Sequence, residues 1–82
     1  MVHSLKCEMD YYVPLCNGTK TFEVRFNDRD YHVGDILKIF ALDRLNRLTG
    51  VFSTFEITYI LRDERFLKHG YVVLGLKLVD FS

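Results

Sequence analysis

A period of two in the apolar residues constrains the fold of this chain more than any other sequence feature. The side chains of a β-strand point alternately to opposite faces of a sheet, so this pattern predicts strands with one apolar face. The segment of residues 36–42 is apolar on nearly both faces, which is typical of a strand covered on both sides or lying in a closed sheet. We expect strands over residues 3–7, 21–26, 36–42, 54–61 and 71–79.

The strand expected over residues 21–26 has the clearest division into two faces. Its sequence, Thr-Phe-Glu-Val-Arg-Phe, alternates strictly between apolar and polar side chains. We expect Phe22, Val24 and Phe26 to face the core, and Glu23 and Arg25 to face the solvent.

Two later strands also have a predicted apolar face. Within residues 54–61 the pattern directs four side chains inward, namely Phe55, Ile57, Tyr59 and Leu61. Within residues 71–79 it directs inward Val72, Leu74, Leu76 and Leu78.

A short helix is expected over residues 10–17, and the charged segment 62–69 has room for a single helical turn. Pro14 limits the first helix to little more than two turns, because proline lacks an N–H group and is tolerated only in the first turn. The pair Asn17-Gly18 is a favourable C-terminal stop.

Strands therefore dominate, and turn residues recur between them. Short connections favour antiparallel neighbours, and many apolar faces in a chain of 82 residues favour a small closed barrel. The 49% of hydrophobic residues suffices for one compact core. The predicted fold is mainly β, a small β-barrel with one or two short helices, and residues 1–82 form one domain.

Charge and hydropathy exclude several classes of protein. Eleven basic residues balance eleven acidic ones, which argues against tight, non-specific binding to long nucleic acids but allows a local patch or a nucleotide pocket. No apolar run approaches the roughly 20 residues of a membrane helix, and residues 1–6 do not resemble a signal peptide. We expect a soluble, cytoplasmic protein.

Cysteines and histidines give no metal site by their spacing. Cys7 and Cys16 are interpreted as reduced, half-buried thiols. His3, His32 and His69 are scattered along the chain without the spacing of metal ligands. We predict neither a metal nor a cofactor.

The candidate functional segment is the charged stretch from Lys20 to Arg29. A purely structural interpretation accounts for part of it, because Glu23 and Arg25 would form an exposed ion pair worth only about 0–1 kcal/mol. Asn27-Asp28 is ordinary turn chemistry.

This stretch resembles the signature of the ASCH superfamily, in which a Gly-x-Lys-Thr-x-Glu-x-Arg type segment lies in a PUA-like β-barrel. The resemblance is closest to a small bacterial and phage branch, and it extends over five segments in the same order. These are His3–Lys6, Gly18–Arg29, Val33–Asp35, Ile57–Ile60 and Gly70–Leu74.

The resemblance implies that the protein binds RNA or a nucleotide, and the residue types are compatible with that role. Lys and Arg side chains can bind phosphate oxygens, Glu and Asn can recognise the edges of a base, and a tyrosine can stack on it. Tyr11 and Tyr12 are further candidates for stacking, although each tyrosine alone is more typical of a packing residue. The candidate ligand-binding residues are Lys20, Glu23, Arg25, Asn27, Arg29 and Tyr31.

Two alternatives remain open. Some ASCH relatives resemble amidohydrolases that use a Lys, a nucleophilic Thr and a Glu, and the catalytic candidates here would be Lys20 and Glu23. Glu23 occupies the position of the nucleophilic Thr, so we favour a binding module over an enzyme. The second alternative is a protein-interaction or phage accessory domain.

We expect the protein to be a monomer. We also expect Lys20 to reach the polar face of the strand only from a bulge or from the loop before the strand.

Overall fold

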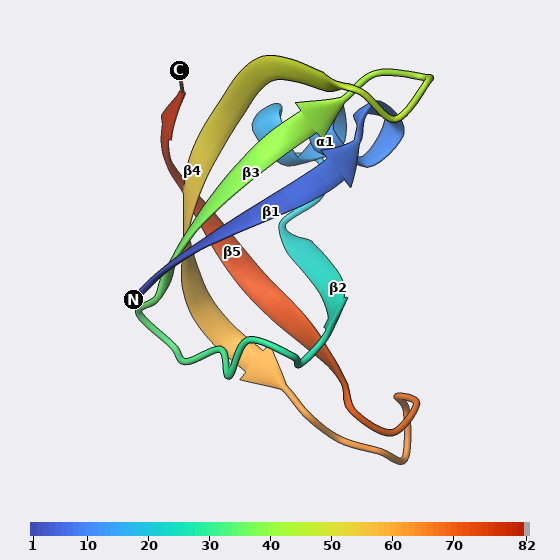
Figure 1. Ribbon diagram of the computed structural model, residues 1–82. Helices are drawn as coiled ribbons and strands as arrows, with labels where there is room; N and C mark the ends of the chain where they lie inside the picture. The colour runs from blue at the N-terminus through green and yellow to red at the C-terminus, as the bar shows by residue number, and fades with distance from the viewer. Residues whose placement is uncertain (82) are drawn as a thin grey trace.

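The computed structural model describes residues 1–81 and contains one short helix and a single curled sheet (Figure 1). The predicted mainly β fold is confirmed, and each expected strand is present. The strand expected over residues 54–61 begins six residues earlier, at Leu48, and the other strands differ from the prediction by small shifts of their ends. Residues 62–69 form hydrogen-bonded turns rather than a helix. The elements are β1 (Val2–Glu8), α1 (Met9–Cys16), β2 (Phe22–Phe26), β3 (Ile36–Leu42), β4 (Leu48–Leu61) and β5 (Tyr71–Phe81).

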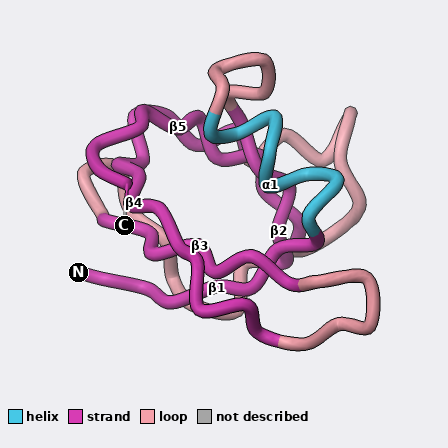
Figure 2. Tube along the Cα trace, turned by 90° about the horizontal axis from the view of Figure 1, so that it is seen from above, coloured by secondary structure: helices cyan, strands magenta, loops and turns pink. Residues whose placement is uncertain are grey.

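The strands follow the order β1-β3-β4-β5-β2 in the sheet. β3, β4 and β5 form an antiparallel meander, and β2 pairs antiparallel with β5. β1 pairs with β3 in parallel, so the expectation of an antiparallel arrangement throughout is wrong for this pair. The reason is the connection through α1, which carries the chain from one edge of the sheet, β1, to the other edge, β2. Seen from above, the sheet curls into a half-barrel around its core (Figure 2).

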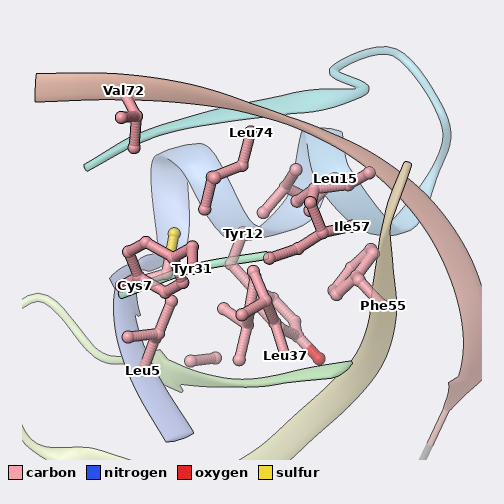
Figure 3. Close-up of a cluster of buried hydrophobic side chains, with 13 residues drawn as sticks. Leu5, Cys7, Tyr12, Leu15, Tyr31, Leu37, Phe55, Ile57, Val72 and Leu74 are labelled. Atoms are coloured by element: carbon pink, nitrogen blue, oxygen red, sulfur yellow. The ribbon is translucent and has the colours of Figure 1, made fainter. Parts of the chain in front are cut away.

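The core fills the concave side of this sheet (Figure 3). β4 is the central strand of the sheet, and the inward side chains of its neighbour β3, namely Leu37, Ile39 and Ala41, are fully buried. α1 adds Tyr12 and Leu15, whose burial explains why so short a helix is stable in this fold. The other buried hydrophobic residues are Leu5, Cys7, Tyr31, Phe55, Ile57, Val72, Leu74 and Leu76.

Helix α1 is as short as expected, but Pro14 is its sixth residue and so lies beyond the first turn, where it was expected. The helix is anchored at both its core face and its end. The hydroxyl groups of Tyr12 and Ser53 lie 2.6 Å apart in the core and share a hydrogen bond. After the helix, Gly18 has a φ of 81°, a left-handed conformation in which a side chain would be strained. None of the helical segments within residues 1–81 is long and apolar enough to cross a membrane.

The orientation of β2 is opposite to the one predicted. Phe22, Val24 and Phe26 are 45%, 50% and 52% exposed, whereas Glu23 is buried and Arg25 is half-buried. A strict alternation defines two faces but does not decide which one the fold covers. Here the partners of Glu23, described below, make burial of the polar face possible.

The orientation of Tyr59 also differs from the prediction, which placed its side chain inward. The pairing of β4 with β5 shifts in register between Ile57 and Tyr59, and Tyr59 is exposed as a result. An irregularity of this kind reverses the faces of all residues that follow it. On β5, by contrast, the predicted inward face is confirmed.

Candidate functional site

Three charged side chains form a compact cluster on the inward face of β2. The side chain of Glu23 is only 7% exposed, and Lys20 and Arg25 both lie against it. Nζ of Lys20 donates to Oε1 of Glu23 at 2.7 Å. Nε and Nη2 of Arg25 donate to Oε2 at 3.0 and 2.8 Å. The cluster has one carboxylate and two cations, so it carries a net positive charge at neutral pH. We call these three residues the Glu23 cluster.

Lys20 reaches this cluster from the loop before β2, one of the two positions that the alternation allowed. Its backbone N–H donates to the carbonyl of Pro14 at 3.0 Å, which fixes the loop against the end of α1. The Lys20 ammonium also lies 5.1 Å from the ring centroid of Tyr11 and 5.5 Å from that of Phe22. Two aromatic rings and one carboxylate therefore hold the ammonium in place.

Arginine side chains bridge the two edges of the half-barrel. Nη2 of Arg25 donates to the carbonyl oxygen of Lys6 on β1 at 2.6 Å. Nη1 of Arg29 donates to the carbonyl oxygen of Ser4, also on β1, at 2.7 Å. We call the gap between β1 and β2 the seam. Side chains rather than a backbone ladder connect its two sides, so groups that bind ligands in other proteins here also hold the fold together.

A groove of about 530 Å³ opens over the Glu23 cluster. The exposed ring of Tyr11 forms one wall, and outward side chains of β2 form another. Glu23 is buried and therefore lies at its floor. The lining residues are Tyr11, Lys20, Phe22, Glu23 and Val24. The groove thus combines aromatic surface, one ammonium and one carboxylate.

Cys7 lies near the Glu23 cluster, in surroundings that disfavour its thiolate form. Burial raises the pKa of its thiol to about 11, and the negative charge of Glu23 also raises it, while Lys20 and Arg25 act in the opposite direction. A thiol with so high a pKa stays protonated, and only the thiolate is strongly nucleophilic. Cys7 and Cys16 are both free thiols.

Two other candidate residues, Asn27 and Tyr31, lie in the loop after β2, and their side chains are engaged in contacts within the fold. Oδ1 of Asn27 accepts a hydrogen bond from the backbone N–H of Tyr31 at 3.1 Å. The side chain of Tyr31 is buried in the core, so its ring is not available as a stacking surface, and the same holds for Tyr12. Of the three tyrosines considered for stacking, the structure therefore leaves Tyr11.

A buried His–Asp pair joins two segments of the sequence signature whose contact was not foreseen. Nε2 of His3 on β1 lies 2.8 Å from Oδ2 of Asp35, and both residues are buried. The backbone N–H of His32 donates to the same oxygen at 3.0 Å. The pair fixes the start of β1 beside the start of β3. The only sequence signal for it was the presence of both residues in segments shared with the ASCH signature.

The contacts of Asp35 predict that the stability of the fold decreases at acidic pH. The hydrogen bond from His3, followed by that from the His32 backbone, holds the pKa of Asp35 well below its usual range. A lowered folded-state pKa stabilises the protein above the unfolded pKa of about 3.9, and this contribution is lost as the pH falls further. We expect Asp35→Asn to lower the melting temperature at pH 7. This deficit should shrink as the pH falls below about 4.

Thermal unfolding of the wild type and Asp35→Asn at a series of pH values measures that difference. Asp10→Asn, a change at an exposed residue of α1, is the control and should leave the melting temperature nearly unchanged. A deficit for Asp35→Asn that stays constant down to the lowest pH would show that the charge of Asp35 does not stabilise the fold.

Comparisons with known proteins support the fold and give a family. A solved structure, "Crystal structure of hypothetical protein PH0355", matches with a TM-score of 0.63 and 13% sequence identity, covering 96% of this chain and 100% of that chain. At this identity the likeness concerns the fold alone. No curated protein matches the chain. One family model, described as "Domain of unknown function (DUF3850)", matches residues 2–76.

Proposed function

The chain belongs to the DUF3850 family, whose description names no activity. From the site we propose that the protein binds RNA or a nucleotide in the groove over the Glu23 cluster. The observation that carries the proposal is the position of the Lys20 ammonium, 5.1 Å from the Tyr11 ring and 2.7 Å from the Glu23 carboxylate. A nucleotide has a flat base, a polar base edge and a phosphate. The groove presents one complementary group to each.

The groups of the cluster have binding capacity left after their mutual contacts. Glu23 accepts three hydrogen bonds, and an ionised carboxylate has about four acceptor sites, so one is left for an N–H group of a base. The ammonium of Lys20 has donors left for a phosphate. Arg25 does not line the groove; it holds Glu23 through Nε and Nη2 and so positions the carboxylate. The resemblance of this segment to the ASCH signature supports the same class of ligand.

The same contacts favour binding over hydrolysis. Three donors already engage Glu23, which leaves it poorly placed to take a proton from water. The nearby Cys7 is protonated at neutral pH, as its raised pKa requires. The groove therefore contains recognition groups without an activated nucleophile among them.

Titration with ligands tests the proposal. We expect single-stranded RNA pentamers or nucleoside monophosphates at millimolar concentration to shift the NMR amide signals of Tyr11 and of residues 20–25. Lys20→Ala should weaken binding about tenfold, since it removes a charge-assisted contact and one cation–π pair. The matched control is Lys77→Ala, a change at an exposed lysine of β5 that does not line the groove.

Two results would contradict the proposal. One is the absence of any shift with RNA, nucleotides or nucleosides. The other is an equal loss of affinity in Lys20→Ala and Lys77→Ala, which would indicate general attraction to positive charge rather than a site.

A further inference from the structure

The outward face of β2 and its neighbours is an exposed apolar surface. It consists of five side chains that we call the outer apolar face, namely Phe22, Val24, Phe26, Tyr59 and Tyr71. They lie on three adjacent strands, because β5 pairs with both β2 and β4 (Figure 1). Gly75, the partner of both Phe22 and Tyr59 in the register, has no side chain to separate those two rings. The five residues are between 40% and 64% exposed.

The size of this face lies in the upper part of the range of about 300–600 Å² given for the largest apolar patch of a monomer, and such a patch is often functional. Four partly exposed aromatic side chains and one valine present on the order of 500 Å² of apolar surface. Monomeric proteins rarely expose more than a few hundred Å² in one patch, and each partner of a standard interface contributes about 800 Å². The outer apolar face is smaller than a whole standard interface and has about the size of its core.

The pattern along β2 indicates which partner would fit. Phe22, Val24 and Phe26 form a stripe that is the same in both directions, with Val24 at its centre. A two-fold interface requires a surface that is complementary to itself, and such a stripe meets that requirement when two copies run antiparallel. We infer that two copies of this chain associate face to face through the outer apolar face, around a two-fold axis at Val24.

Charge supports a second copy at the ends of the stripe. The Lys20 ammonium lies 5.5 Å from the ring centroid of Phe22, at one end. Asp28 is exposed and follows Phe26 by two residues, at the other end. An antiparallel arrangement brings Lys20 of one copy toward Asp28 of the other, twice per dimer.

This inference does not rest on nucleotide binding, and it replaces the expectation of a monomer. In the sequence analysis Phe22, Val24 and Phe26 were expected to face the core. Two of these residues, Phe22 and Val24, also line the groove, so the dimer and the groove adjoin along β2.

Paired charge substitutions test both the dimer and its register. The proposed axis places Phe26 of one copy opposite Phe22 of the other. F26E and F22K should each be folded, since both side chains are half exposed, and each should raise the dimer dissociation constant at least tenfold. An equimolar mixture of F26E with F22K should form a heterodimer, because it places Glu against Lys at one contact and retains Phe against Phe at the other.

The mixture of F26E with F26K is the matched control, because the two-fold axis does not bring these positions together, and it should remain monomeric. Sedimentation equilibrium measures the masses, and circular dichroism confirms the fold of each variant. A wild type that stays monomeric at millimolar concentration would overturn the inference. So would F26E associating as tightly as the wild type, or equal association in the two mixtures.

Discussion

Glu23→Ala is expected to lower the free energy of unfolding by about 2–3 kcal/mol, a large share of the roughly 5 kcal/mol expected for a domain of this size. The substitution leaves Lys20 and Arg25, whose side chains are 18% and 25% exposed, without their shared carboxylate. Arg25 also loses the group that aligns it with the carbonyl of Lys6 across the seam. Urea denaturation followed by circular dichroism measures this change in the free energy of unfolding.

Two companion variants separate a lost ion pair from a lost side chain. Glu64→Ala removes an exposed glutamate from the loop before β5 and should change stability by less than about 0.5 kcal/mol. Replacing the whole cluster, in Lys20→Met/Glu23→Leu/Arg25→Met, should recover more than half of the loss, because no buried charge is then left unpaired. If Glu23→Ala is as stable as the wild type, the cluster does not hold β2 in place.

Phe55→Ala is expected to cost about 4 kcal/mol, whereas Phe22→Ala should cost about 1 kcal/mol or less. Phe55 is 1% exposed in the core, and Phe22 is 45% exposed on the outer apolar face (Figure 3 shows Phe55). The two changes remove the same atoms, so the difference in unfolding free energy reports the difference in burial. The comparison is best made at low protein concentration, where association through Phe22 does not contribute.

Equal costs for the two phenylalanines would mean that Phe22 is buried, as its sequence pattern alone suggested. In that case Glu23 and Arg25 would face the solvent. Val24→Ala is a second probe of the same face, and it should also cost less than about 1 kcal/mol.

The sequence predicted the elements well because their signals are local. Segments in which apolar residues recur at every second position predicted the strands. Pro14 and Gly18 predicted the short helix and its end. The mainly β fold followed from these elements. The parallel pairing of β1 with β3 was not predictable in this way, because it depends on where α1 delivers the chain rather than on any residue of either strand.

The sequence predicted part of the candidate site, again from local signals. Lys20, Glu23 and Arg25 were singled out together, and the structure brings their charged groups into contact. Their burial could not be read from the sequence, because it depends on three charged groups compensating one another and on the carbonyl groups of β1. Tyr31 was a candidate for stacking, but it is buried, which agrees with the packing role that is more typical of a single tyrosine.

The topology also determines the order in which the sheet can be completed during synthesis. Within residues 1–81, β2 pairs only with β5, the last strand of the chain, while β1 pairs with β3. β2 must therefore remain unpaired until β3, β4 and β5 have been synthesised and β5 is available. During that interval both of its faces are uncovered, including the three apolar residues that remain exposed after folding. A nascent chain of this protein thus carries the open edges of β2 until β5 becomes available, and unpaired strand edges are sites at which chains associate readily.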